Sequence, residues 1–204
     1  QPAPVAALSR AQSTAAPISD VRSNAAPRAA GARQSCARTV DPGRLTAEAA
    51  LQQGWCLMDI DRPIEAIQAF EVATKGRSET TRRDAAWGQS LAYLRSELVY
   101  QAAVAAIRAP QSPQRARELQ TAILAQRAVG AYERGRYVEA LMALDRRAQI
   151  APERNDLMVL RGYAYLKLSR LTDAQKVFRA VAATGNRDAK RGLAEVNEML
   201  ESAR

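Results

Sequence analysis

The residues of this 204-residue chain best suited to covalent chemistry are its two cysteines, Cys36 and Cys56. Two cysteines allow a single intramolecular disulfide. The bridge would close a loop of about 20 residues and stabilise the fold by roughly 3 kcal/mol in the chain-entropy model. It would also imply an oxidising compartment. The alternative is two unrelated thiols, one exposed and one buried, and of the two we favour the bridge.

Histidine is absent from the chain, and several classes of site are excluded with it. Ser-His-Asp and Cys-His nucleophile systems both need an imidazole base. HExxH sites need histidine ligands, and two cysteines cannot form a four-ligand zinc site. Among the carboxylates, Asp59 and Asp61 stand just before Pro63, which is typical of a turn that ends a helix. We therefore predict a protein that is not an enzyme and that binds neither a metal nor a cofactor.

The charge of the chain is strongly basic, with a formal net charge of +9. No run of Lys and Arg exceeds two residues, and aromatic residues do not alternate with basic ones in the manner of RNA-binding motifs, so we predict no nucleic-acid partner. A weak attraction to acidic polysaccharide or to an anionic surface is compatible with this charge. The apolar stretches fall far short of the roughly 20 residues that cross a bilayer, so the protein would be peripheral to a membrane at most.

Residues 1–45 differ in composition from the rest of the chain. They are rich in Ala and Pro and contain no Phe, Trp or Tyr. Such a segment buries too little apolar surface to offset the entropy of ordering its backbone, and its X-Pro steps favour extended conformations. We predict an extended Ala/Pro-rich tail or linker. The first residue is Gln1 rather than Met, which favours removal of a signal peptide, with a shortened chain as the alternative.

From residue 46 onward, apolar residues recur with the spacing of amphipathic helices, and no strand-like alternation is sustained. This predicts an all-α fold. Ser112 followed by Pro113 is a helix-start signal, so a longer helix is expected over about 113–134. A final helix with one apolar stripe is expected within 187–204, where it would cap the preceding array. The residues of that stripe are Leu193, Val196, Met199 and Leu200.

Four segments of the chain repeat one pattern of small and large residues. A small residue in a first helix is followed by a second small residue early in the next helix, and then by a residue that is usually large one turn further on. The small residues would let the two helices approach closely, and the large one would fill the gap. The positions are Gly54, Ala66 and Phe70; Ser90, Ala102 and Ala106; Ala128, Ala140 and Leu144; and Gly162, Ala174 and Phe178.

The pattern resembles the tetratricopeptide repeat (TPR) family, whose unit is a helix–turn–helix of 34 residues. The resemblance implies a TPR-like solenoid of about four repeats over 46–186. The second unit departs from the family pattern, since Ala106 stands where a large residue is usual and the spacing to the third unit is stretched. The units are expected at about 47–80, 83–116, 121–154 and 155–188.

The resemblance also implies a binding surface, because the first helices of such repeats line a concave face. A continuous apolar groove there would suit an extended or helical peptide. The alternative is that these side chains simply pack adjacent helices together. A groove residue such as Trp87 should tolerate truncation better than the core residue Phe178. The predicted groove consists of Trp55, Met58, Trp87, Leu91, Leu94, Val129, Tyr132, Val159, Tyr163 and Leu166.

These features together predict a non-catalytic protein–protein interaction scaffold, or a subunit of a bacterial envelope assembly. The arrangement is similar to periplasmic TPR proteins that accompany exopolysaccharide secretion, including cellulose-type systems. One alternative is a pilus or secretin assembly factor. Another is a carbohydrate-binding module in which Trp55, Trp87, Tyr132 and Tyr163 stack on sugar rings. The expected location is periplasmic or secreted, with the cytoplasm as the alternative.

Overall fold

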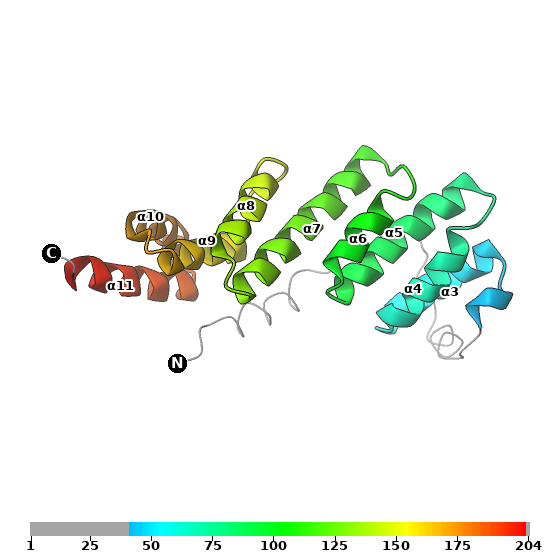
Figure 1. Ribbon diagram of the computed structural model, residues 1–204, viewed down its shortest axis with the longest axis horizontal. Coiled ribbons are helices and arrows are strands. Elements are labelled where there is room, and N and C mark those ends of the chain that lie inside the picture. Colours follow the sequence, from blue (N-terminus) through cyan, green and yellow to red (C-terminus); the bar gives the residue numbers. More distant parts are fainter. Residues whose placement is uncertain (1–40, 203–204) are drawn as a thin grey trace. The chain divides into compact units, whose positions relative to one another are not determined.

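The computed structural model describes residues 41–202, and within this range it contains nine α-helices, one short 3-10 helix and no strand (Figure 1). The predicted all-α fold is thus confirmed, whereas residues 1–40 of the predicted tail lie outside the described part. The elements are η2 (Pro42–Arg44), α3 (Ala47–Asp59), α4 (Pro63–Ala73), α5 (Glu79–Arg95), α6 (Val99–Ala106), α7 (Pro113–Glu133), α8 (Tyr137–Ala148), α9 (Asn155–Lys167), α10 (Leu171–Ala182) and α11 (Arg187–Ser202).

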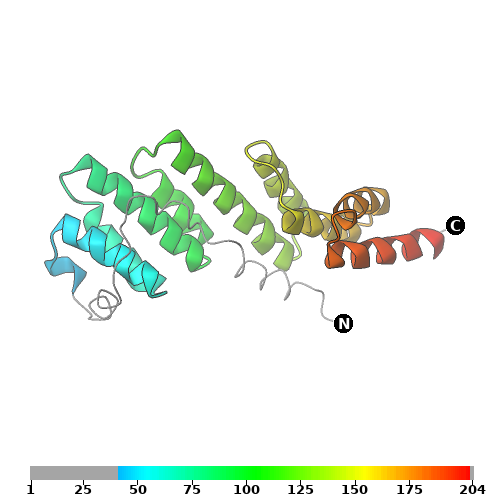
Figure 2. The ribbon, with the colours of Figure 1, turned by 180° about the vertical axis from the view of Figure 1, so that it is seen from behind.

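The described residues form two compact units, 41–123 and 124–202, called here the N-terminal and C-terminal units. The boundary falls within α7, which is one continuous helix. In each unit the helices pack in the order of the sequence, as both views show (Figures 1 and 2). In the N-terminal unit α4 packs on α3, α5 on α4, and α6 on α5. In the C-terminal unit α9 packs on α8, α10 on α9, and α11 on α10.

Polar side chains cap the starts of several helices, and one of these caps, Ser112, was predicted from the sequence. The side chain of Thr46 accepts a hydrogen bond from the Ala49 amide at the start of α3, and Ser78 does the same for α5. Ser112 accepts from the Arg115 amide at 3.3 Å, so the predicted cap of the long helix is confirmed. Each bond satisfies an amide that has no partner within its helix.

Four helix pairs share one turn geometry, in which a first helix (α3, α5, α7 or α9) connects to a second helix (α4, α6, α8 or α10). One residue of each turn adopts the left-handed conformation, and the amide that follows it donates to a carbonyl five residues earlier in the chain. This bond is the 6→1 bond of the Schellman motif. The left-handed residues are Asp61, Glu97, Gly135 and Ser169.

Three of these turns also share an ion pair that the other lacks. In the α9–α10 turn, Arg170 contacts Asp173, with Nη2 of the arginine 2.7 Å from Oδ2 of the aspartate. The α3–α4 and α7–α8 turns hold the same arginine–carboxylate pair, between Arg62 and Glu65 and between Arg136 and Glu139. In the α5–α6 turn the two positions hold Leu98 and Gln101. The second pair therefore differs from the others at its outer surface as well as at Ala106.

Two phenylalanines fill equivalent spaces between helices. Phe70 on α4 is fully buried against Gly54 of α3 and Gly88 of α5, and a Cβ added to Gly54 would stand 2.6 Å from the ring. Phe178 on α10 is fully buried against Gly162 of α9 and Gly192 of α11 in the same way. Only glycine lets a helix backbone come this close to a ring, which explains why Gly54 accompanies Phe70 and Gly162 accompanies Phe178 in the first and fourth units of the repeat pattern.

Helix α11 covers the far side of Phe178. Its Ala189, Gly192 and Val196 are buried, and the side chain of Asn186 accepts a hydrogen bond from the Ala189 amide at the start of the helix. Leu193 and Leu200 are half-buried, as the stripe predicts, but Met199 is exposed. The stripe therefore narrows towards the C-terminal end of α11, where no further element covers it among the described residues.

Candidate functional site

All ten residues of the predicted groove lie on the first helices, and the structure gathers them in two sets of five. Eight of them are buried, and Trp55 and Leu91 are half-buried. The set in the N-terminal unit is Trp55, Met58, Trp87, Leu91 and Leu94, and the set in the C-terminal unit is Val129, Tyr132, Val159, Tyr163 and Leu166.

In the N-terminal unit the aromatic groove residues are packed by neighbouring helices. Only 2% of the Trp87 surface is exposed, and it lies in a cluster with Leu119 of α7. The guanidinium of Arg115 covers its ring at 5.3 Å. Trp55 stacks edge-on against Phe70 with ring centroids 5.2 Å apart. Trp87 is therefore a packing residue here, while Trp55 keeps part of its surface open.

In the C-terminal unit both tyrosines of the predicted groove are also buried. Burial raises the pKa of Tyr132 to about 12, because the phenolate is poorly solvated there. Tyr163 stacks edge-on against Phe178 at 4.9 Å, and its hydroxyl donates to the carbonyl of Asp188 at 3.4 Å. Burial raises the pKa of Tyr163 as well. Both rings thus join helices of this unit to one another.

The burial of the predicted groove residues limits how a partner could bind to them. A side chain packed between helices is not available to a ligand unless the helices separate, which would expose core surface at a cost of about 25 cal/mol per Å². Trp55 and Leu91 are the groove residues with surface open to a ligand. The groove itself stays a prediction, and its accessible portion lies on α3 and α5.

A polar hollow of about 170 Å³ lies near the N-terminal ends of α5 and α7, lined by Thr80, Arg83, Asp84, Ser112 and Arg115. Both arginines have carboxylate partners, since Arg83 pairs with Glu79 and Arg115 with Asp84. The positive charge of the hollow is therefore already balanced, which does not favour an anionic ligand.

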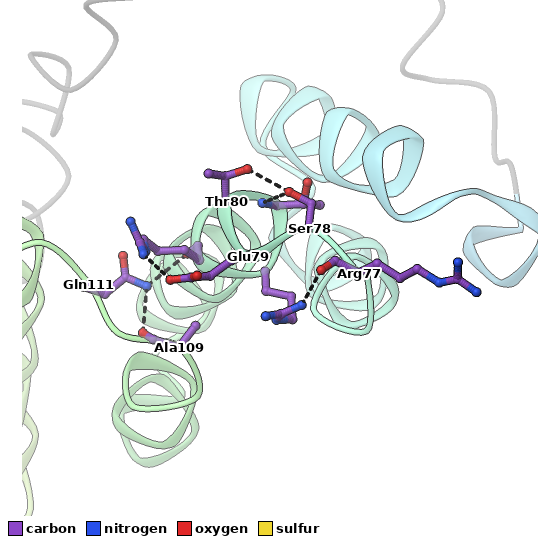
Figure 3. Close-up of polar contacts among 9 residues, drawn as sticks. Arg77, Ser78, Glu79, Thr80, Ala109 and Gln111 are labelled. Carbon is purple, nitrogen blue, oxygen red and sulfur yellow. Dashed lines mark hydrogen bonds and ion pairs between the residues drawn. The ribbon is translucent and has the colours of Figure 1, made fainter.

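The contacts beside this hollow join the α6–α7 loop to α5, as Figure 3 shows. The side-chain amide of Gln111 donates to the carbonyl of Arg83 at 3.0 Å and to that of Ala109 at 3.2 Å. The hydroxyls of Ser78 and Thr80 lie 2.8 Å apart at the start of α5. The Gln111 bonds hold the loop between α6 and α7 against α5, so the contacts beside the hollow serve the packing of the unit.

A second polar network joins α4 and α5 to Arg108, which lies two residues beyond the end of α6. The fully buried Gln89 donates to Oε2 of Glu71 at 2.8 Å, and Arg108 donates to both residues. Burial raises the pKa of Glu71, but the hydrogen bonds from Gln89 and Arg108 outweigh it and hold that pKa below its usual value of 4.5. The network ties the end of α6 to the two preceding helices.

An ion-pair network around the buried Arg161 of the C-terminal unit was not predicted from the sequence. Arg161 on α9 is only 8% exposed, and its Nη2 lies 2.8 Å from Oε1 of Glu153. Its Nη1 bonds Asp145 on α8. Arg147 donates to the carbonyl of Pro152 at 3.0 Å. Because these contacts fix the α8–α9 loop and balance the charges, we assign them to the fold.

The carboxylates Asp59 and Asp61 both lie where α3 ends. Asp59 is the last residue of α3, and Asp61 is the left-handed residue of the α3–α4 turn, so the predicted helix-ending turn is confirmed. Cys56 lies on α3, and the described residues contain no free cysteine. Its predicted partner Cys36 lies outside the described residues, so the pairing stays a prediction.

Two negative observations hold for residues 41–202. No cluster of three or more His, Cys, Asp or Glu side chains in this range is placed to hold a metal ion. No helix in it combines the length and the apolar character needed to cross a membrane.

The periodicity of apolar residues did not predict one exposed surface, formed by Tyr100 on α6 and by Ile107, the residue that follows this helix. Both are apolar at helical spacing and so look like core residues in the sequence. Comparing the second helices position by position would have singled them out.

No family model, no curated protein and no solved structure matches this chain. The TPR resemblance therefore stays a prediction from the repeat pattern.

Proposed function

We propose that the chain is a TPR-like, non-catalytic scaffold that binds protein partners within a bacterial envelope assembly, such as one for exopolysaccharide secretion. The observation that carries the proposal is the repetition of one helix pair. Four pairs share the same Schellman turn, and two of them share the Phe–Gly packing that sets the distance between helices. Arrays of this kind are built to present extended surfaces.

The compartment is the second part of the proposal. Two cysteines in a chain of 204 residues, with no free cysteine in its described part, are compatible with a disulfide in an oxidising compartment such as the periplasm. Intact mass under non-reducing conditions tests this directly. A mass about two units below that of the reduced protein supports a bridge between Cys36 and Cys56. If both thiols react with an alkylating agent, the disulfide is absent and no longer supports a location in the bacterial envelope.

The carbohydrate-binding alternative is less favoured by the burial of its proposed platforms. Sugar stacking needs open aromatic faces, but Trp87, Tyr132 and Tyr163 are buried and only Trp55 is partly open. A pilus or secretin assembly factor remains a variant of the scaffold proposal, and the identity of the captured partner would decide between them.

The experiment places a photo-crosslinking amino acid at position 55 or at position 91 of the full chain in its native host. Residues Trp55 and Leu91 are the half-buried members of the predicted groove, so a bound peptide should crosslink there. Ile64 on the outer surface of α4 is the control position, since it is exposed and lies on a second helix.

A discrete protein crosslinked from positions 55 and 91 but not from 64 supports a groove-binding scaffold and names its pathway. Crosslinks that form equally at all three positions, or at none of them, would contradict groove binding. A glycan array should be probed in parallel with the wild type and with Trp55→Ala. Specific glycan binding that Trp55→Ala abolishes would favour the carbohydrate-binding alternative.

A further inference from the structure

Basic side chains gather around the connection between α10 and α11, away from the predicted groove. Residues 174–194 contain five basic residues and one acidic residue, so this short stretch carries a net charge of +4 in a chain whose total is +9. All five basic residues are exposed. They are called here the basic junction, and they are Lys176, Arg179, Arg187, Lys190 and Arg191.

The packing of α10 on α11 brings these side chains together. Only residues 183–186 separate the two helices, so the last turn of α10, which holds Arg179, adjoins the first turns of α11 (Figures 1 and 2). Further from this connection, Gln175 donates to Oδ1 of Asn197 at 2.7 Å, which holds the two helices side by side. Arg179 stands four residues after Gln175, and Lys190 stands seven residues before Asn197, so each lies on the same side of its helix as that bond. Arg179 and Lys190 therefore flank the same seam between α10 and α11.

The basic junction differs from many other arginines of the chain in lacking carboxylate partners. Within residues 41–202, no ion pair involves any of its five side chains. In the same unit, by contrast, Arg154 pairs with Asp156 and Arg170 with Asp173. Arg187 is also the first residue of α11, where a positive charge opposes the helix dipole. Ion pairing within the unit therefore does not explain these charges.

The surface around the basic junction offers charge without large apolar side chains. Phe178, the aromatic residue of the stretch, is fully buried, and Val177 and Leu193 are half-buried. Protein interfaces usually have an apolar centre, and a helix bound to a membrane surface inserts apolar side chains. Proteins that bind single-stranded nucleic acid stack its bases on aromatic side chains. The exposed chemistry therefore suits a hydrophilic polyanion best.

We propose that the basic junction binds an acidic polysaccharide through the carboxylate groups of its sugar residues. Three of the five side chains are arginines, whose planar guanidinium holds a carboxylate through two parallel hydrogen bonds. Each exposed ion pair contributes little, but carboxylates repeated along one polymer engage several side chains at once. The proposal gives the proposed scaffold a second partner, and it rests on that function for the choice of an envelope polymer.

Calorimetric titration of the full chain with polygalacturonate at low ionic strength tests the proposal. The wild type should bind this carboxylated polysaccharide, and added salt should weaken the binding, because it screens exposed charges. The triple variant Arg179→Gln/Arg187→Gln/Lys190→Gln should bind at least about tenfold more weakly, since three of the five contacts lose their charge. Unchanged helical circular dichroism would show that the variant is folded.

The matched control removes two arginines and one lysine from exposed positions on α7, α8 and α9, and it should bind like the wild type. This control is Arg117→Gln/Arg146→Gln/Lys167→Gln. Trp55→Ala should also bind like the wild type, which separates the basic junction from the carbohydrate-binding alternative.

Four results would overturn the proposal. The first is a wild type that does not bind polygalacturonate. The second is equal weakening by the two triple variants, which would indicate a response to net charge alone, and the third is loss of binding in Trp55→Ala. The fourth is tighter binding to polyglutamate, to single-stranded DNA or to phosphatidylglycerol vesicles than to polygalacturonate. Because groove crosslinking detects a protein partner at other residues, failure of this proposal is distinguishable from failure of the proposed function.

Discussion

The ring of Phe178 lies directly against the backbone of Gly192, so that a Cβ on this glycine would stand 2.5 Å from Cζ of the ring. The two residues belong to neighbouring helices, α10 and α11, and Phe178 is fully buried. Neither the ring nor the helix backbone can move without disturbing a close-packed core. The distance between α10 and α11 is thus set by the absence of one side chain.

Gly192→Ala should destabilise the chain by about 2 kcal/mol, because an extra methyl group overpacks this contact. Gly130→Ala is the matched control, since Gly130 is also within a helix of the C-terminal unit. Its added Cβ would meet only the end of the Arg134 side chain, which can move away. The control should gain about 0.5–1 kcal/mol from the better helix propensity of alanine. Urea unfolding measures both, and equal effects would contradict the role given to Gly192.

Trp87→Ala should cost about 3–5 kcal/mol, as much as Phe178→Ala, because both side chains are almost fully buried. The sequence-based expectation was that Trp87 would tolerate truncation better than Phe178. Ile64→Ala, at an exposed position of α4, should change stability by about 0.5 kcal/mol or less. Thermal and urea unfolding provide the comparison. A small loss of unfolding free energy in Trp87→Ala would indicate that Trp87 is an accessible groove residue.

Ser169→Gly should stabilise the chain by about 1 kcal/mol. Ser169 is held at a φ of 57° in the α9–α10 turn, where a Cβ costs about 1–2 kcal/mol and glycine fits without strain. The reciprocal change, Gly135→Ser in the α7–α8 turn, should destabilise by a similar amount, since Gly135 has a φ of 73°. Chemical unfolding of both variants checks the sign. A loss of stability in Ser169→Gly would show that the serine makes a compensating contact.

Glu71→Gln should change how stability depends on pH. The pKa of Glu71 in the folded chain lies below its usual value of 4.5, so the ionised carboxylate favours folding. Its contribution is present above about pH 4.5 and is lost as the pH falls through the lowered pKa. The melting temperature of the wild type should therefore exceed that of Glu71→Gln at pH 7, and the difference should shrink towards pH 3. A difference independent of pH would contradict this.

Much of the fold could be predicted from the sequence, because helix spacing and end signals are local. The helix expected over about 113–134 is α7, Pro113–Glu133, and the expected final helix is α11, which begins at Arg187. Small and large residues of the repeat pattern contact each other in the structure, since Phe70 and Phe178 pack on glycines of neighbouring helices. These features depend on residues close in sequence or on a repeated spacing.

The candidate site was harder to predict, because an apolar stripe does not reveal what covers it. The residues Trp87 and Tyr163 were placed on the correct helices, but neighbouring helices bury them. The residues Tyr100 and Ile107 also stand at the spacing of a helical apolar stripe, but they are exposed. Burial is decided by contacts between elements, which single-helix patterns do not contain. The network around Arg161 was missed for the same reason, since its partners come from another helix and a loop.

The largely sequential packing of the helices has a kinetic consequence. Each helix pairs mainly with the next ones in the chain, so the native contacts are local and the contact order of each unit is low. Chains of this kind close only short loops during folding and reach the native state quickly. Amide exchange should accordingly follow position within the array, with slow exchange around Phe70 and Phe178 and fast exchange in the last turns of α11.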